Sequence, residues 1–209
     1  SEVVKAWGRL GYPRRALRLH ATAKIIASDF SDEVPSDIEL LKTLPGIGDY
    51  TAKAIASFAF GQSHNVLDIN IRRVFARLID GNENPTQGVT KHELNERPVF
   101  GPTWSAAIME LGALICTAKN PKCEKCPLAR SCKWLTIGSP KSDQARRTQS
   151  WHGTNRQCRG MILQHLRVNT KQVRKESFDW KDRDQLEKCL QELIDEGFIH
   201  AKSGRYTLS

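Results

Sequence analysis

Residues 116–132 read CTAKNPKCEKCPLARSC, with cysteines at four positions in the spacing C-x6-C-x2-C-x5-C. Few apolar residues lie between Cys116, Cys123, Cys126 and Cys132, so packing alone does not explain the segment. Four thiolates this close can surround one metal centre. Their spacing differs from the paired C-x2-C arms of a zinc site. It is typical of a single cluster held by four thiolate ligands.

Two other chemistries use the same four cysteines. Two disulfides would need an oxidising compartment, and the sequence shows neither a signal peptide nor a membrane span. A structural zinc site stays open, because thiolate affinity alone does not choose between zinc and iron–sulfur. We predict a 4Fe-4S cluster on the four cysteines and no association with a membrane.

Length and charge bound the class of protein. The chain has 209 residues, 39% of them hydrophobic, and a formal net charge of +9. This suits one or two domains and an anionic partner. Residues 133–159 hold six Lys or Arg and one Asp, in a polar composition that predicts irregular chain. A solvated tether and a basic strap along a phosphate backbone fit this segment equally well.

Apolar periodicity predicts an all-α first domain. Helices are expected at 15–28, after a capping box at Ser36–Glu39, at 49–60, at 69–79 and at 103–115, with a short helix near 90–96. In the helix at 69–79 the apolar side chains form a buried stripe. Other faces carry its three arginines, Arg72, Arg73 and Arg77.

The last fifty residues have a different pattern. Helices are expected at 160–167 and 182–195, the second with Cys189 on its apolar stripe as a buried thiol. GFIHAKSGRYTLS then alternates around Ser203-Gly204, which indicates a hairpin. Helices followed by a two-stranded wing resemble a winged-helix module, and an accessory domain without DNA contact fits the same pattern. The predicted domains are 1–135, a basic linker at 136–158, and 159–209.

LPGIG at 44–48 lies between two predicted helices, which is the helix–hairpin–helix pattern. Gly46 and Gly48 can take backbone angles closed to other residues, and N–H groups around Ile47 then face outward at a helix start. Such groups form a phosphate site. In VLDIN, Asp68 precedes the next helix. It is either an N-cap or a carboxylate that faces the DNA backbone and stabilises a cationic sugar.

Taken together, LPGIG, VLDINIRRVFARL and MELGALICTAKNPKCEKCPL resemble the helix–hairpin–helix DNA glycosylases with an iron–sulfur loop. The likeness is closest to the MutY-type adenine glycosylases and covers most of residues 1–135. It implies a mainly α fold and base-excision repair of duplex DNA with adenine opposite 8-oxoguanine or guanine. It also implies base flipping, a monomer, and a bacterial-type cytoplasmic, nucleoid-associated enzyme.

The resemblance also implies residue roles. Asp68 would stabilise the sugar cation, and Asn70 would orient Asp68 and the DNA backbone. Tyr50 stands where the bifunctional endonuclease III branch has a nucleophilic lysine, which implies a monofunctional enzyme, and Lys53 is expected to be solvated or phosphate-facing. The hairpin, with a monovalent cation, and the cluster loop would bind phosphates with Gly46, Ile47, Gly48, Lys119, Lys122, Lys125 and Arg130.

Two departures from the family pattern matter. The family's general-acid glutamate and its Gln-Gln-Thr motif lie upstream of the stretch that WGRLGYPRRALRLH resembles. Because general acid catalysis contributes about 10²–10⁴-fold, we expect the chain as given to be impaired. The family's Nudix-like domain, which reads 8-oxoguanine, has no counterpart in 140–209. An inactive iron–sulfur module that binds duplex DNA is therefore a second hypothesis, and an iron–sulfur transcription regulator a third.

Overall fold

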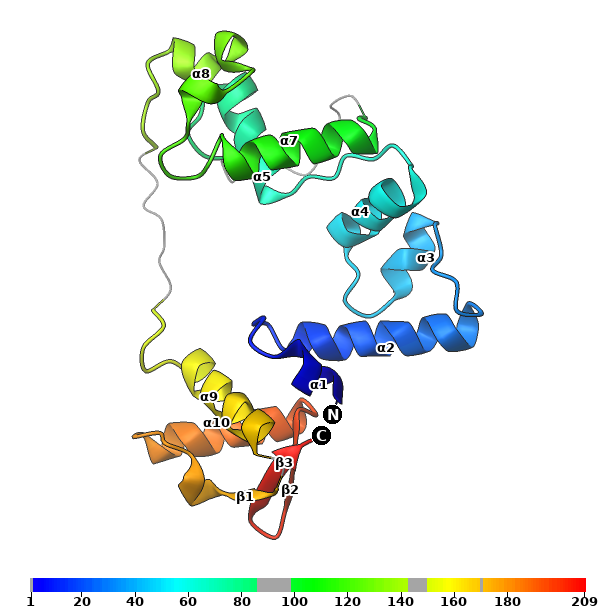
Figure 1. Cartoon of the computed structure of the whole chain (residues 1–209), viewed down its shortest axis with the longest axis vertical. Coiled ribbons are helices and arrows are strands. Elements are labelled where there is room, and N and C mark those ends of the chain that lie inside the picture. The colour runs from blue at the N-terminus through cyan, green and yellow to red at the C-terminus, as the bar shows by residue number, and fades with distance from the viewer. Residues whose placement is uncertain (1, 86–98, 143–149, 170) are drawn as a thin grey trace. The chain divides into compact units, whose positions relative to one another are not determined.

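The computed structural model describes residues 2–85, 99–142, 150–169 and 171–209 (Figure 1). These residues form two compact units, 2–28 with 150–209, and 29–142. As predicted, the fold is mainly helical, with a small sheet near the C-terminus. The predicted boundaries at 135 and 159 stay a prediction. Among the described helices, none combines the length and the apolar character that a bilayer crossing requires.

The first unit joins the two ends of the chain. It contains the helices α1 (Glu2–Trp7), α2 (Arg14–Asp29), α9 (Asn155–Val168) and α10 (Arg183–Asp195). Val4 of α1 is fully buried in one core with Cys158, Leu186, Cys189 and Phe198. The apolar stripe predicted around Cys189 is therefore confirmed. Arg14 and Arg159 both pair with Glu196, which ties α2 and α9 to the end of α10.

A three-stranded antiparallel sheet completes this unit. Its strands are β1 (Val173–Arg174), β2 (Ile199–Lys202) and β3 (Arg205–Leu208), in the order β1-β3-β2, with the short helix η4 (Lys175–Ser177) after β1. Ser203 and Gly204 have φ values of 50° and 70°. Two positive φ angles are the geometry that a two-residue hairpin needs, so the hairpin prediction is confirmed. The sequence did not predict β1, because two residues show no alternation.

The second unit carries the remaining helices. They are α3 (Ile38–Thr43), α4 (Asp49–Phe60), α5 (Ile69–Phe75), the π-helical turn η1 (Ala76–Asp80), α7 (Pro102–Leu114), η2 (Cys123–Lys125), η3 (Ala129–Ser131) and α8 (Lys133–Thr136). Asp37, and not Ser36, caps α3 by accepting from the amide of Leu40. A carboxylate also suits the positive end of a helix better than a hydroxyl. The helix predicted near 90–96 lies outside the described residues.

Packing of α5 against α7 makes the core of the second unit. Ile71, Val74 and Phe75 of α5 meet Ile108 of α7 there. The rings of Trp104 and Phe75 stack with their centroids 5.8 Å apart. This packing fixes the start of α5 beside α7, and the candidate site is built at that start.

Candidate active site and iron–sulfur centre

The hairpin between α3 and α4 has one residue that must be glycine. Gly46 has a φ of 82°, a left-handed conformation that side chains disfavour. Gly48 is the N-cap of α4 with a φ of −98°, which any residue adopts, so the backbone argument was wrong there. A Cβ at Gly48 would meet only open space. Glycine at this position leaves the start of α4 uncovered. The amide of Ile47 is used within the turn, donating to Leu44 at 3.1 Å.

Asp68 is the N-cap of α5, and both of its carboxylate oxygens are held. Oδ1 accepts from the backbone amide of Ile71 at 2.6 Å, and Oδ2 accepts from Nδ2 of Asn70 at 2.8 Å. The capping interpretation is therefore confirmed. Two fixed hydrogen bonds also hold a half-buried carboxylate in one orientation. The same geometry suits an electrostatic role, because a group held in advance needs no reorganisation.

Tyr50, in the first turn of α4, lies close enough to Asp68 for the charge of that carboxylate to act on it. Its side chain is 46% exposed. Burial and, second, the nearby Asp68 carboxylate raise the pKa of the Tyr50 phenol. A phenol that titrates above its ordinary value stays neutral at physiological pH. Lys53, one turn further along α4, lies 3.5 Å from the Asp49 carboxylate in an ion pair.

A buried arginine connects this carboxylate to the cysteine loop. Arg73 is only 6% exposed. Its Nε donates to the carbonyl oxygen of Cys116 at 2.8 Å, and Nη2 donates to Oδ1 of Asn70 at 2.8 Å and to the carbonyl oxygen of Gly112. Asn70 in turn donates to Asp68. The placement of Arg73 away from the buried stripe was therefore wrong: backbone oxygens satisfy its charge inside.

Gly112 lets α7 approach α5 at this point. A Cβ on Gly112 would lie 2.7 Å from the Cβ of Asn70 and 3.0 Å from its carbonyl oxygen. No side chain fits at those distances without moving a helix. The close approach is what brings the Gly112 carbonyl within reach of Arg73.

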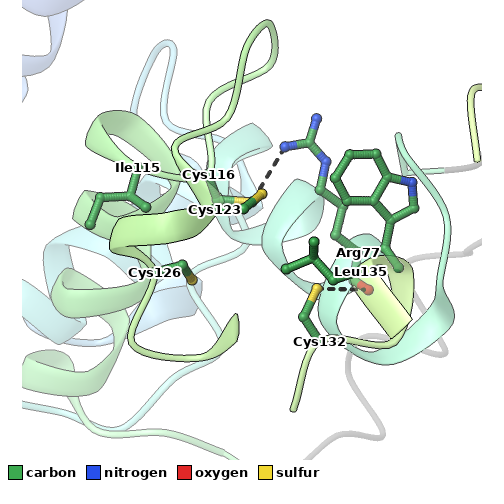
Figure 2. A pocket seen from close by; sticks show the side chains of 8 residues that line it. Arg77, Ile115, Cys116, Cys123, Cys126, Cys132 and Leu135 are labelled. Carbon is green, nitrogen blue, oxygen red and sulfur yellow. Dashed lines mark hydrogen bonds between the residues drawn. The ribbon is translucent and has the colours of Figure 1, made fainter. Parts of the chain in front are cut away.

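The four predicted ligand cysteines line one cavity (Figure 2). Cys116, Cys123, Cys126 and Cys132 all contribute to its wall. All four are free thiols. In the described part of the chain, no three His, Cys, Asp or Glu side chains converge as they would around a single ion. A pocket lined by four thiols can hold a cluster with one iron for each thiolate.

Arg77 supplies positive charge at this cavity, as Figure 2 shows. It is 2% exposed, so its predicted placement away from the buried stripe was also wrong. Nη1 donates to Sγ of Cys116 at 3.4 Å and to the carbonyl oxygen of Thr117 at 2.8 Å. The guanidinium also stacks over Trp134 at 4.9 Å. A fixed cation balances thiolates that would otherwise repel one another.

One of the four cysteines is affected by its surroundings without a metal. Burial, followed by the charges of the other three cysteines, raises the pKa of the Cys123 thiol. The Cys123 thiol therefore keeps its proton until a metal replaces it. When bound, a cluster would supply iron–thiolate bonds that hold residues 116–132 in one shape.

Four cations stand on the surface of the same loop. Lys119, Lys122, Lys125 and Arg130 are all exposed, and none of them pairs with an acidic residue that the structure describes. The structure thus places the predicted phosphate ligands of the loop together on the cluster segment. It does not bring them into the carboxylate site.

Comparisons with known proteins agree with this geometry. Residues 29–58 match the helix-hairpin-helix motif, and residues 116–132 match the iron-sulfur binding domain of endonuclease III. The whole chain is 43% identical to the adenine DNA glycosylase of Mycolicibacterium smegmatis, covering 74% of that protein. The chain belongs to the adenine DNA glycosylase family. It is therefore a DNA glycosylase of base-excision repair, with an iron–sulfur site.

More distant members and solved structures extend the likeness. The human adenine DNA glycosylase is 36% identical over 63% of this glycosylase and 26% of its own length. A thermostable thymine-DNA glycosylase structure superposes with a TM-score of 0.55 at 28% identity, covering 65% of each chain. Endonuclease III in a non-covalent DNA complex gives a TM-score of 0.50 at 26% identity, covering 60% of each.

Proposed function

We propose that this glycosylase removes adenine paired with 8-oxoguanine or guanine, by flipping the adenine out of duplex DNA and hydrolysing its N-glycosidic bond. The observation that supports this most directly is the Asp68 carboxylate, held by Asn70 and by the start of α5. As the base leaves, positive charge develops on the deoxyribose. A carboxylate fixed beside that sugar stabilises the charge without first having to reorient.

The proposed reaction releases the base without cutting the strand. Strand cutting by this superfamily's Schiff-base route needs an amine nucleophile. Tyr50 occupies the position expected for that amine, and a neutral phenol forms no Schiff base. The nearest amine on α4, Lys53, is engaged with Asp49, and an ion-paired ammonium is not a nucleophile.

DNA contacts in this proposal come from two places. At the hairpin, the uncovered start of α4 at Gly48 receives a phosphate, assisted by a monovalent cation on nearby carbonyl oxygens. At the cluster loop, the exposed cations meet further phosphates. The proposal also includes a monomer that works in the reducing cytoplasm close to the nucleoid, where the cysteines stay reduced.

The test is single-turnover adenine release from three duplexes, with adenine opposite 8-oxoguanine, guanine or thymine. We expect slow release from the first two, none from the third, and strand breaks only after alkali. Borohydride should trap no covalent complex. Asp68→Asn serves as the inactive control. A chain that binds all three duplexes and releases no adenine supports the binding-module hypothesis instead.

A further inference from the structure

The C-terminal sheet carries a row of positive charges across its strands. Arg174 of β1 pairs in register with Arg205 of β3, and Arg205 pairs with Lys202 of β2. Residues directly opposite one another in an antiparallel sheet point to the same face, with Cβ atoms about 4.5–5.5 Å apart. Three cations therefore lie side by side, and we call them the wing row.

The wing row faces away from the core. Val173, Tyr206 and Leu208 alternate with it along β1 and β3, and these three belong to or pack against the core of the first unit. The next outward pair is His200 with Thr207. Every outward position of the three strands is therefore basic or neutral, and none is acidic.

The three cations of the wing row repel one another, and no described acidic side chain offsets this repulsion. Like charges placed directly opposite on a sheet are destabilising. No described side chain pairs with any of the three, although acidic residues pair with cations elsewhere in the same unit. Lys175, the residue after β1, has Glu187 as its partner. An uncompensated row beside satisfied neighbours indicates an anion from outside the chain.

We propose that the wing row binds the phosphate backbone of the duplex that the glycosylase acts on. The choice of duplex DNA rests on the proposed function, since DNA is the polyanion that this enzyme class handles. Three strands about 4.8 Å apart span roughly 10 Å. Phosphates of one DNA strand rise by roughly 3.4 Å each along the axis and also wind around it. A row of this length, with long flexible side chains, can therefore reach neighbouring phosphates, and its charge is opposite to theirs.

The sheet, and not the preceding helix, makes this contact. In helix-turn-helix proteins a recognition helix enters the major groove. Here the corresponding helix, α10, exposes three acids, Asp184, Glu187 and Asp195, and two bases, Arg183 and Lys188, so its surface suits phosphates less well than the wing row does. Phosphate contacts position a protein without specifying sequence. The wing row therefore adds affinity for any duplex and leaves the choice of base to the carboxylate site.

The experiment measures duplex affinity of the full chain against salt by fluorescence anisotropy. The test variant replaces Arg174, Lys202 and Arg205 with Gln. The matched control replaces three exposed lysines of the same unit, Lys24, Lys181 and Lys188, with Gln, which removes the same charge. We expect the test variant to bind more weakly at low salt, with the slope of log K against log salt smaller by about 2.7, at about 0.9 for each phosphate. The control should change the slope by much less.

Reversing one charge of the wing row distinguishes a loss of DNA binding from a loss of stability. Arg205→Glu places an acid between two cations, so it should raise the melting temperature while it weakens DNA binding. A folded triple variant with the wild-type salt slope would overturn the proposal, as would an equal effect of the control. If the face takes an acidic protein partner instead, the variants will lose that partner and keep their DNA affinity, which also overturns it. Excision rates at saturating enzyme test the proposed function separately. Because all of the DNA is then bound, substitutions in the wing row should leave these rates unchanged.

Discussion

Arg73 donates a hydrogen bond of 2.8 Å from Nε to the carbonyl oxygen of Cys116, the first cysteine of the cluster loop. The other side of the same guanidinium holds Asn70, which holds Asp68. One buried side chain thus connects the loop that the cluster shapes to the carboxylate that the reaction needs. A change in the loop therefore reaches Asp68 through hydrogen bonds alone.

Replacing that arginine should damage both stability and excision. Arg73→Gln removes charge-assisted hydrogen bonds to buried oxygens, so we expect a loss of about 2–3 kcal/mol in the free energy of unfolding. Without Arg73, Asn70 no longer holds Asp68 in a fixed orientation. Single-turnover excision should then fall by about 10²-fold, as it does after small misplacements at active sites. Arg72→Gln is the control, because within the described residues the Arg72 side chain makes one longer hydrogen bond, 3.3 Å from Nε to the carbonyl oxygen of Leu67. Equal excision by the two variants would contradict the connection.

Asp68 has two roles that two substitutions can separate. Asn is as good an N-cap as Asp, so Asp68→Asn should leave the unfolding free energy within about 0.5 kcal/mol of wild type, whereas Asp68→Ala should cost about 1 kcal/mol. Both should lose about 10²–10³-fold in excision, the usual effect of removing one electrostatic group. Urea unfolding and single-turnover assays measure the two effects. Normal excision by Asp68→Asn would show that the carboxylate only caps.

Two glycines in helices should respond in opposite directions to alanine. Gly112→Ala places a methyl group 2.7 Å from Asn70, and overpacking of this kind costs about 1–3 kcal/mol. Gly160→Ala on α9 has nothing within 4 Å, so removing a flexible residue from a helix should stabilise by about 0.5–1 kcal/mol. Thermal melts of both variants check the pair. A Gly112→Ala variant with the wild-type melting temperature would mean that α5 and α7 separate easily.

Acid should weaken the first unit through one carboxylate. The Arg14 guanidinium, assisted by Arg159, lowers the pKa of Glu196 from 4.5 to about 2. A depressed folded-state pKa gives stability that is present above 4.5 and is lost as the pH falls toward 2. Glu196→Gln should be less stable at neutral pH and should have a flatter stability curve between pH 4.5 and 2. If wild type and Glu196→Gln lose stability equally between pH 4.5 and 2, Glu196 is not a source of the acid sensitivity.

The cluster ligands can be told apart from the other thiols. Cys132→Ser should lose bound iron, measured per chain, and should weaken duplex binding through the disordered loop. Cys158→Ser is the control, since burial raises the pKa of that thiol to about 12 and it lies in the core of the other unit. Full iron content in Cys132→Ser would remove that cysteine from the ligand set.

Much of this molecule follows from local patterns in the sequence. The spacing of the four cysteines predicted one shared cavity, and the periodicity of α10 predicted a stripe around Cys189. The carboxylate before α5 was correctly read as a cap. Each of these depends on residues close together in the chain, which is why sequence alone reached them.

What the sequence did not yield depends on contacts between distant segments. Arg73 and Arg77 look like solvent-facing residues of an amphipathic helix, and the oxygens that bury them come from the segment around Cys116. Their spacing of four residues, which puts both on one helix face, was the available signal. Gly112 reads as an ordinary helix glycine until Asn70 is placed beside it. The partnership of Val4 with the C-terminal helices has no local signal at all.

That partnership of Val4 affects how the protein is made. The helices α1 and α2 leave the ribosome well before their core partners on α9 and α10. The unit formed by residues 29–142 has all its pieces while synthesis is still under way, so it can fold as an insert. Meanwhile the apolar face of α1 waits, unprotected, for about 150 residues of translation. During this interval the exposed apolar surface makes the nascent chain prone to aggregation.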